Sequence, residues 1–358
     1  MTAATMAMVL LCSACSSSGT ASPTTTAAAS TTAAKAAAGP PVPSSGCAKP
    51  QTGPVTNQRL NIEVDGASRW YLLNTPSPAT PSPTGLRRSS TAAAIPRPLV
   101  IDFHGLSEGA VIHSTTTMFG QLGQKDGFVA VFPEGTGSPV QWNTSATAHP
   151  NADLEFVTAM LNQLEAELCI DTSRVYASGL SDGSFMVSLV ACTMANRFAA
   201  VAAVSGLQLP KPCRPTRRVP VIAFNGTADP ILFFNGGVGT ATLNRLLGRG
   251  GTAPSSPTTT APVHVNLDGP GFPATVKAWA LKDGCNPHAT DARTSSQIIL
   301  RTYRCPAGTG VQFYIIIGGG HAWPGSRFSQ EISSLTGFTT FQINATDVIW
   351  AFFQRFRL

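Results

Sequence analysis

The sequence has few charged residues and no apolar run long enough to span a membrane. Asp, Glu, Lys and Arg make up 12% of the 358 residues, and the basic ones are scattered although the net charge is +6. Nucleic-acid binding needs clustered basic residues, so we exclude it and retain a mild attraction to an anionic envelope surface. The apolar run near the N-terminus, within residues 6–15, is too short for a permanent membrane span.

Zinc-type C-x-x-C pairs are missing beyond Cys15. Six of the eight cysteines follow that residue, and an even number outside the cytosol favours disulfides. Sequence alone allows several pairings. Two pairs would close short loops and leave one long-range pair that joins the start of the folded domain to its middle, so we expect Cys192–Cys213, Cys285–Cys305 and Cys47–Cys169.

The N-terminal segment resembles a bacterial lipoprotein signal, with Cys15 as the lipid-bearing residue. Cys12 stands where such signals usually have Leu, and no Lys or Arg precedes the apolar run. A plain secretory signal, or none, is the alternative. Residues 16–45 are rich in Ala, Thr, Ser and Pro and are expected to form a disordered tether. The folded domain is then 46–358, in the extracellular space or the cell envelope.

Six short apolar runs, each ending near Gly, Pro or Asn, predict strands. Strands that are apolar on both faces are typical of a parallel sheet covered by helices. Before them, residues 61–76 alternate apolar and polar side chains as a hairpin does. The six runs are residues 98–105, 127–135, 174–179, 198–206, 219–226 and 312–320.

Helix-like segments separate these runs. Residues 153–170 place leucines and a valine at helical spacing, and residues 184–198 and 345–356 repeat the pattern. Alternation of strands and helices predicts a doubly wound, mostly parallel α/β sheet with helices on both faces. Residues 236–270 are too polar and too rich in Gly and Pro for a core element, and we expect a surface insertion that is either inert or borders a substrate cleft.

Two G-x-S-x-G motifs compete for the role of nucleophile elbow, "GLSEG" around Ser107 and "GLSDG" around Ser181. Ser181 follows a central strand and precedes an apolar helix, as an elbow should. Residues 110–120, after Ser107, begin with β-branched and turn-like residues and make a poor first helical turn. We therefore expect Ser181 to be the nucleophile and the Ser107 loop to complete the oxyanion hole, with backbone donors at Leu106 and Asp182.

A serine nucleophile needs a base and an acid that orients the base. Asp229 lies in the loop after an expected strand and is our choice of acid, with an Asx turn as its alternative role; Asp268 and Asp283 are weaker candidates. His321, on a Gly-rich loop after the last strand, is the expected base. His104 more plausibly holds the oxyanion loop by hydrogen bonding, and the remaining histidines, including His113, are expected on the surface.

With "HGLSEG", "GLSDG", "NGTADPI" and "GGGHAWPG" together, the chain resembles the extracellular poly(3-hydroxybutyrate) depolymerase and feruloyl esterase family of α/β-hydrolases from about Cys47 to the C-terminus. The resemblance implies that Ser181, Asp229 and His321 form the triad. Trp323 matches the Trp of the family's histidine loop, and Trp142 lies in a further matching segment. We take His104, Trp142 and Trp323 as substrate-cleft candidates.

The chain departs from the family at three places. Ser184 replaces the Gly or Ala that commonly follows the elbow, "HGLSEG" lacks the Cys found in the depolymerase branch, and the insertion after Phe234 is unusual. The sequence also contains no recognisable substrate-binding domain, which makes an insoluble polyester a less expected substrate.

We therefore expect a secreted or lipid-anchored serine esterase that needs no metal or organic cofactor and takes a small or oligomeric ester as its substrate. Acyl transfer in the envelope, a silent binding protein on the same fold and a serine peptidase are the alternatives.

Overall fold

The computed structural model describes residues 39–51, 53–77, 94–249 and 265–358 of the chain. The expected signal segment, with its lipidation candidate Cys15, lies outside the described residues, as do most of the tether and residues 250–264 of the insertion. In the described part of the chain, no helix has both the length and the apolar character that crossing a membrane requires.

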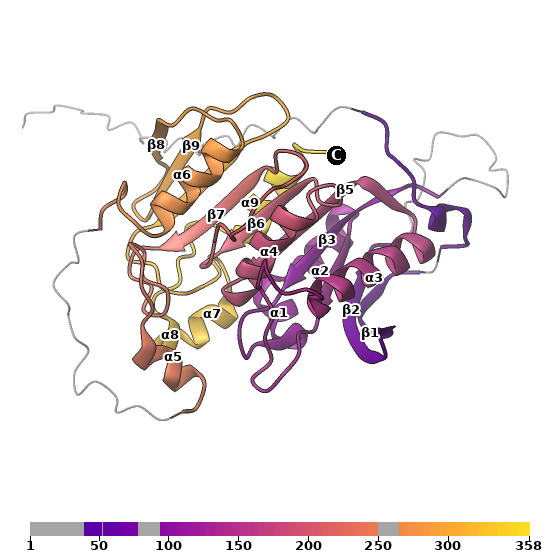
Figure 1. Ribbon diagram of the computed structural model, residues 1–358. Helices are drawn as coiled ribbons and strands as arrows, with labels where there is room; N and C mark the ends of the chain where they lie inside the picture. The colour runs from indigo at the N-terminus through magenta and orange to yellow at the C-terminus, as the bar shows by residue number, and fades with distance from the viewer. Residues whose placement is uncertain (1–38, 52, 78–93, 250–264) are drawn as a thin grey trace, which may run out of the picture. The chain divides into compact units, whose positions relative to one another are not determined.

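The described residues form one ten-stranded sheet (Figure 1), whose order is β1-β2-β4-β3-β5-β6-β7-β10-β9-β8. The strands β3, β4, β5, β6, β7 and β10 are parallel to one another, and antiparallel strands extend the sheet on both sides. The strands are β1 Val55–Val64, β2 Ala67–Thr75, β3 Arg97–Phe103, β4 Val129–Pro133, β5 Ile170–Leu180, β6 Ala200–Val204, β7 Val221–Gly226, β8 Ala289–Arg293, β9 Ile298–Tyr303 and β10 Val311–Ile316.

The six parallel strands coincide with the six apolar runs of the sequence. All residues of β4, β6 and β7 are buried, because helices cover both faces. The hairpin expected at residues 61–76 is the β1–β2 pair, which turns at Asp65 and Gly66. The fold is thus the doubly wound, mostly parallel α/β sheet that the alternation of strands and helices predicted, and it is of the α/β-hydrolase type that the resemblance implied.

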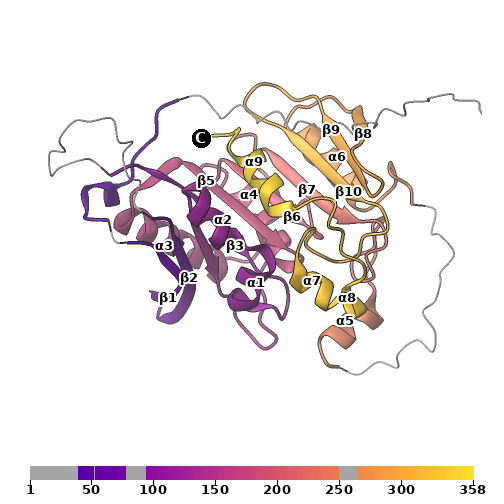
Figure 2. The ribbon, with the colours of Figure 1, turned by 180° about the vertical axis from the view of Figure 1, so that it is seen from behind.

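Helices cover the two faces of the sheet in separate groups (Figures 1 and 2). One core cluster contains apolar residues of α3 (Ala152–Glu167), α4 (Asp182–Thr193) and α6 (Phe272–Lys282). The other contains residues of α1 (Gly109–Thr117), α2 (Phe119–Asp126) and α9 (Ala345–Phe353). Shorter segments complete the described chain: η1 Ser45–Ala48, α5 Thr240–Leu246, α7 Arg327–Glu331 and α8 Ser333–Thr336.

Helix α1 contradicts the expectation that the segment after Ser107 would not start a helix well. The Ala110 N–H donates to Glu134 Oε2 at 2.6 Å, which supplies an acceptor to the first turn. His113, Thr116 and Thr117 of the helix are buried. Tertiary contacts therefore override the weak helix propensity of this segment.

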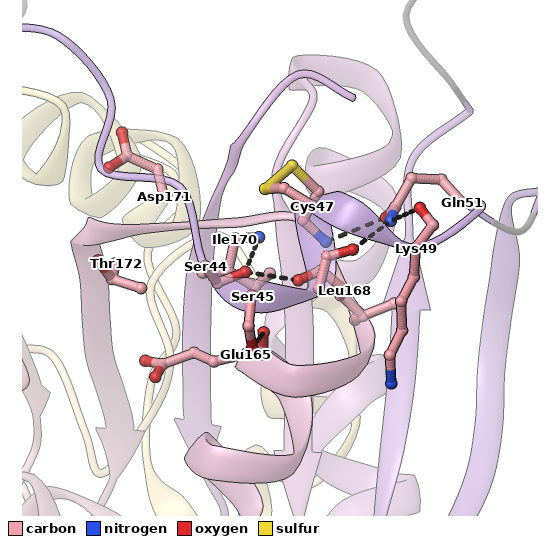
Figure 3. Close-up of a disulfide and its surroundings, with 12 residues drawn as sticks. Ser44, Ser45, Cys47, Lys49, Gln51, Glu165, Leu168, Ile170, Asp171 and Thr172 are labelled. Atoms are coloured by element: carbon pink, nitrogen blue, oxygen red, sulfur yellow. Dashed lines mark hydrogen bonds between the residues drawn. A yellow bond between two sulfur atoms is a disulfide. The ribbon is translucent and has the colours of Figure 1, made fainter. Parts of the chain in front are cut away.

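The N-terminal arm of the domain begins earlier than the expected boundary at residue 46. Ser44 Oγ donates to the Leu168 carbonyl at 2.7 Å and accepts the Ile170 N–H at 3.0 Å (Figure 3). The Val42 N–H donates to Asp171 Oδ1. The Cys47–Cys169 disulfide holds the arm at the junction between α3 and β5. Residues 39–45, assigned to the tether from composition, are hence part of the folded domain.

The structure pairs the other four cysteines as Cys192–Cys213 and Cys285–Cys305. These are the two short loops that the spacing favoured. In the insertion, α5 is a seven-residue helix without a buried residue, in line with the expected surface position.

The C-terminus meets the N-terminal arm. Arg357 donates to the carbonyl of Gly39 at 3.0 Å and to Ser173 Oγ at 2.7 Å, and it pairs with Asp171 at 3.2 Å. The Leu358 N–H donates to the Ser173 carbonyl. Both ends of the described domain are thus fixed near the start of β5. The carboxyl end of β5 lies at the opposite edge of the sheet.

Candidate active site

The expected site residues lie at the carboxyl edge of the parallel strands. The loop 104–108 follows β3, Ser181 follows β5, Asp229 lies in the loop after β7, and His321 lies beyond β10. In the sheet, β3 is next to β5 and β7 is next to β10. Loops that leave neighbouring parallel strands at their carboxyl ends gather at one edge, where α/β proteins bind ligands.

Ser181 occupies a sharp turn between β5 and α4. Its backbone has φ 57° and ψ −117°, a conformation that non-glycine residues rarely adopt and that is typical of a nucleophile elbow. The two glycines of the motif make the turn possible. A Cβ on Gly183 would lie 2.0 Å from the Phe103 carbonyl oxygen, and one on Gly179 would lie 2.6 Å from the Gly183 backbone. Any larger residue at these positions would push the elbow away from β3.

Asp229 and His321 are in direct contact. The Asp229 Oδ2 and His321 Nδ1 atoms are 2.8 Å apart, and both side chains are buried. The other carboxylate oxygen, Oδ1, accepts the N–H groups of Ile231 and Leu232 at 2.8 Å each. The Asx turn therefore fixes one oxygen of Asp229, and the second oxygen is directed to the imidazole.

The competing acids are engaged elsewhere. Asp283 accepts hydrogen bonds from Thr309 Oγ1 and from the Val219 N–H, and burial raises the pKa of Asp283 to about 6. Asp268 pairs with Arg301 at 2.9 Å.

Ser181 and His321 form no hydrogen bond within the described ranges. Hydrogen bonds between a nucleophile and its base often tighten only in the substrate complex. With Nδ1 bonded to a carboxylate, the neutral His321 ring carries its lone pair on Nε2, the nitrogen that can accept a proton.

The loop after β3 packs directly on the elbow. A Cβ on Gly105 would lie 3.5 Å from Ser181 Cβ. The Ser107 N–H donates to the Val140 carbonyl and the Glu108 N–H to the Gly105 carbonyl. By contrast, the N–H groups of Leu106 and Asp182 meet no acceptor among the residues that the structure describes. Two free donors beside the serine are what an oxyanion hole requires.

His104 holds this loop from within the core. Its Nε2 accepts the Gly135 N–H at 2.9 Å, so its Nδ1 carries the proton and donates to the Gly105 carbonyl at 2.7 Å. Burial lowers the pKa of His104 to about 4, and the ring is neutral at pH 7. The role of loop support that the sequence suggested agrees with this geometry, whereas the assignment of His104 to the substrate cleft does not.

Trp142 and Trp323 are buried as well, so none of the three cleft candidates lines an open cleft. Trp142 stacks beside His104, and its indole N–H donates to the His104 carbonyl at 2.9 Å. Trp323 is 1% exposed and donates to Thr346 Oγ1. Burial of a large aromatic side chain is favourable. Trp142 and Trp323 therefore pack in the core beneath the loops that contain them.

Asp182 connects the elbow to the segment around Trp142. Its Oδ2 accepts the Trp142 backbone N–H at 2.8 Å. Burial raises the pKa of Asp182 to about 6, while the Trp142 hydrogen bond lowers it and the charge of Asp153 raises it further. The residue after Ser181 thus has a backbone N–H without an acceptor among the described residues and a carboxyl group whose pKa is raised by burial.

Sequence reasoning missed a buried ionic cluster below the oxyanion loop. His113, expected on the surface, is 0% exposed and lies between the carboxylates of Asp102 and Glu108. The signal was the pattern of Glu108 at the end of the loop and His113 five residues later, on a helix that the sequence did not predict.

Comparison with known proteins relates the chain to esterases. Residues 85–244 match the family model described as Esterase PHB depolymerase. Feruloyl esterase B of Piromyces equi is 26% identical over 63% of this chain, but the chain spans only 39% of that protein. The putative esterase NocK of Nocardia uniformis is 28% identical over 82% of this chain and 81% of its own length.

The fold has a counterpart among solved structures. An acetyl xylan esterase from Aspergillus awamori superimposes with a TM-score of 0.50 at 13% identity, over 78% of this chain and 98% of that one. This likeness concerns the fold alone. The family match and the relatives, for their part, support a hydrolase acting on carboxylic ester bonds.

Proposed function

We propose that this protein is a serine esterase that works through a Ser181–His321–Asp229 triad and an acyl-enzyme. The observation that carries the proposal is the 2.8 Å contact between Asp229 and His321 at the sheet edge where Ser181 occupies a strained turn. A buried carboxylate bonded to Nδ1 fixes the imidazole tautomer that a serine nucleophile needs.

Each group has a defined part in the proposed reaction. Ser181 Oγ attacks the ester carbonyl carbon while His321 Nε2 accepts its proton, and the carbonyl oxygen becomes an oxyanion. The free N–H groups of Leu106 and Asp182 stabilise that charge. Collapse of the tetrahedral intermediate expels the alcohol, which takes the proton from His321. Water, activated by the same histidine, then releases the carboxylic acid and regenerates Ser181.

The relatives suggest the class of substrate. Two of them are named for feruloyl and acetyl xylan esters, which are esters of a small acid with a sugar hydroxyl. We propose such esters as substrates of this chain, with short-chain synthetic esters as practical probes.

An extracellular or envelope location follows from the three disulfides, because such bonds persist in oxidising compartments. Lipid attachment at Cys15 is a separate part of the proposal. We expect Cys15→Ala to move the protein from the detergent phase to the aqueous phase in detergent partitioning. Unchanged partitioning would rule the anchor out.

The proposal is tested by hydrolysis of short p-nitrophenyl esters with the wild type, Ser181→Ala and Ser107→Ala side by side. Ser181→Ala is expected to lose at least about 10⁴-fold in kcat. Ser107 is exposed and keeps its backbone hydrogen bond in the alanine variant, so Ser107→Ala should stay within a few-fold of the wild type. Equal activity of all three proteins would refute the triad.

A further inference from the structure

Both ring nitrogens of His113 face a carboxylate. The Nδ1 atom lies 3.0 Å from Glu108 Oε2, and the Nε2 atom lies 3.2 Å from Asp102 Oδ2. The contact with Glu108 has the geometry of a hydrogen bond. The contact with Asp102 does not, and it is an ion pair only. The His113 and Asp102 side chains are fully buried and that of Glu108 is 11% exposed.

The two carboxylate contacts favour a charged ring. A neutral imidazole has one N–H and one lone pair, and the lone pair would face an anionic oxygen at one of the two sites. Burial lowers the pKa of His113, but Glu108 and Asp102 outweigh that effect and raise the pKa to about 10. Burial likewise opposes ionisation of Glu108, yet His113 holds the pKa of that carboxyl at about 2. The cluster is an imidazolium between two carboxylates.

The same carboxylate that holds His113 also closes the oxyanion loop. Glu108 Oε2 accepts the Gly105 N–H at 2.7 Å, and Glu108 Oε1 accepts the Thr116 hydroxyl at 2.7 Å. The Glu108 N–H donates to the Gly105 carbonyl, and the Ser107 N–H donates to the Val140 carbonyl. In the stretch 105–108, Leu106 alone keeps an N–H without an acceptor among the described residues.

His113 also contacts the loop that bears the expected base. Its ring meets the indole of Trp323 edge-on, with ring centroids 6.1 Å apart. Trp323 follows His321 by two residues, and its backbone N–H is bonded to Ser329 Oγ. His113 therefore contacts both the 105–108 turn, through Glu108, and the loop that bears His321, through Trp323.

We propose that His113 is a positioning residue: held between Glu108 and Asp102, it orients the 105–108 turn so that the Leu106 N–H points to the oxyanion. The inference rests on the proposed esterase function and deepens it. His113 itself touches no substrate. Without its charge, Glu108 would have no buried counter-charge and would shift towards solvent or take up a proton. The Gly105 hydrogen bond would weaken, and the Leu106 donor would lose its fixed direction.

The test compares kcat and KM of His113→Gln, Glu108→Gln and Thr116→Val with those of the wild type on one p-nitrophenyl ester. A lost oxyanion donor lowers kcat by about 10²-fold or more. We expect a loss of that order for His113→Gln and Glu108→Gln, with KM changed less than about threefold because the donor acts mainly in the transition state. Thr116→Val removes one hydrogen bond of Glu108 but keeps the ion pair, and should lose only a few-fold. His288→Gln, an exposed histidine, is the matched control and should equal the wild type.

Active sites are counted by fluorophosphonate titration, so that kcat refers to folded enzyme only. A variant with a misplaced donor still labels fully but slowly, because its triad is intact. Its affinity for a boronic acid that mimics the oxyanion should fall in the same proportion as kcat. If kcat per titrated site of His113→Gln equals that of the wild type, His113 is merely structural and the proposal is wrong. If the wild type itself neither turns over nor labels, the proposed function fails first, and the positioning role fails with it.

Discussion

His321 Nδ1 lies 2.8 Å from Asp229 Oδ2, although 92 residues separate the two side chains in the sequence. The hydrogen bonds of Asp229 fix the orientation of this pair. Asp229 Oδ1 is occupied by two backbone N–H groups of its own loop, so the carboxylate cannot rotate without breaking both bonds. The acid therefore presents one oxygen, at a fixed angle, to the imidazole.

Asp229→Asn should inactivate the enzyme without unfolding it. The amide oxygen can keep the bonds to Ile231 and Leu232, which leaves the amide N–H₂ facing His321 Nδ1. That donor forces the ring proton onto Nε2, the wrong tautomer for a general base, and kcat should fall by about 10⁴-fold. The measurement is ester hydrolysis, with the thermal midpoint as a control for folding. Activity within tenfold of the wild type would contradict the role of Asp229.

Asp182→Asn should change how stability depends on pH. Burial raises the pKa of Asp182 in the folded state from its ordinary value of 3.8 to about 6. Protonation is therefore favoured in the folded state, so the stabilisation is present below about pH 4 and is lost as the pH rises through about 6. Asn mimics the protonated form and its oxygen can still accept the Trp142 N–H. Between pH 4 and 7 the variant should gain up to about 3 kcal/mol in unfolding free energy relative to the wild type. A difference that stays constant in urea titrations across this range would show that the carboxyl is not perturbed.

Ser184→Ala should cost stability but little activity. The Ser184 hydroxyl lies 2.7 Å from two carbonyl oxygens, those of Gly179 and Val204, and is fully buried. Removal of the donor should destabilise the protein by about 1–2 kcal/mol. The small side chain keeps the close packing of α4, so kcat should stay within about threefold. Ser145→Ala, at an exposed position, is the control, and an equal midpoint for the two variants in urea would contradict the prediction.

Loss of the Cys47–Cys169 disulfide should lower stability and leave catalysis unchanged. The bond closes a loop with a sequence separation of 122, for which chain entropy gives up to about 5 kcal/mol. Cys169 and Ser181 lie at opposite ends of β5, roughly 40 Å apart at about 3.3 Å per residue. We expect Cys47→Ser/Cys169→Ser to melt at a lower temperature than Cys285→Ser/Cys305→Ser, which opens a separation of 20. Reduced kcat at 25 °C in the folded Cys47→Ser/Cys169→Ser protein would show that the arm communicates with the site.

The central sheet and the contact between Asp229 and His321 could be predicted because each depends on local patterns. Buried parallel strands are continuous apolar runs, and the loop at the carboxyl end of such a strand is where catalytic groups gather. The outer strands β8 and β9 have no such run. In β8 every residue is at least partly exposed, so its sequence does not differ from that of a loop.

The side chains behind the site could not be predicted from residue type. His104, Trp142 and Trp323 have the chemistry of cleft residues, and only the tertiary structure shows that their polar atoms are used within the core. His113 is the clearest case. Its burial as a cation depends on Asp102, from a strand, and Glu108, from a loop, and a helix of weak propensity brings the three together.

The hydrogen bond between Arg357 and Gly39 of the N-terminal arm has a practical consequence. Both ends of the described domain leave the molecule at the start of β5, while Ser181 lies at the end of that strand. A support, a fusion partner or an affinity tag attached at either end is therefore joined to the side remote from catalysis. We expect the enzyme to be immobilised through Gly39 or Leu358 with its catalytic edge facing the solution, where a bulky ester can reach it.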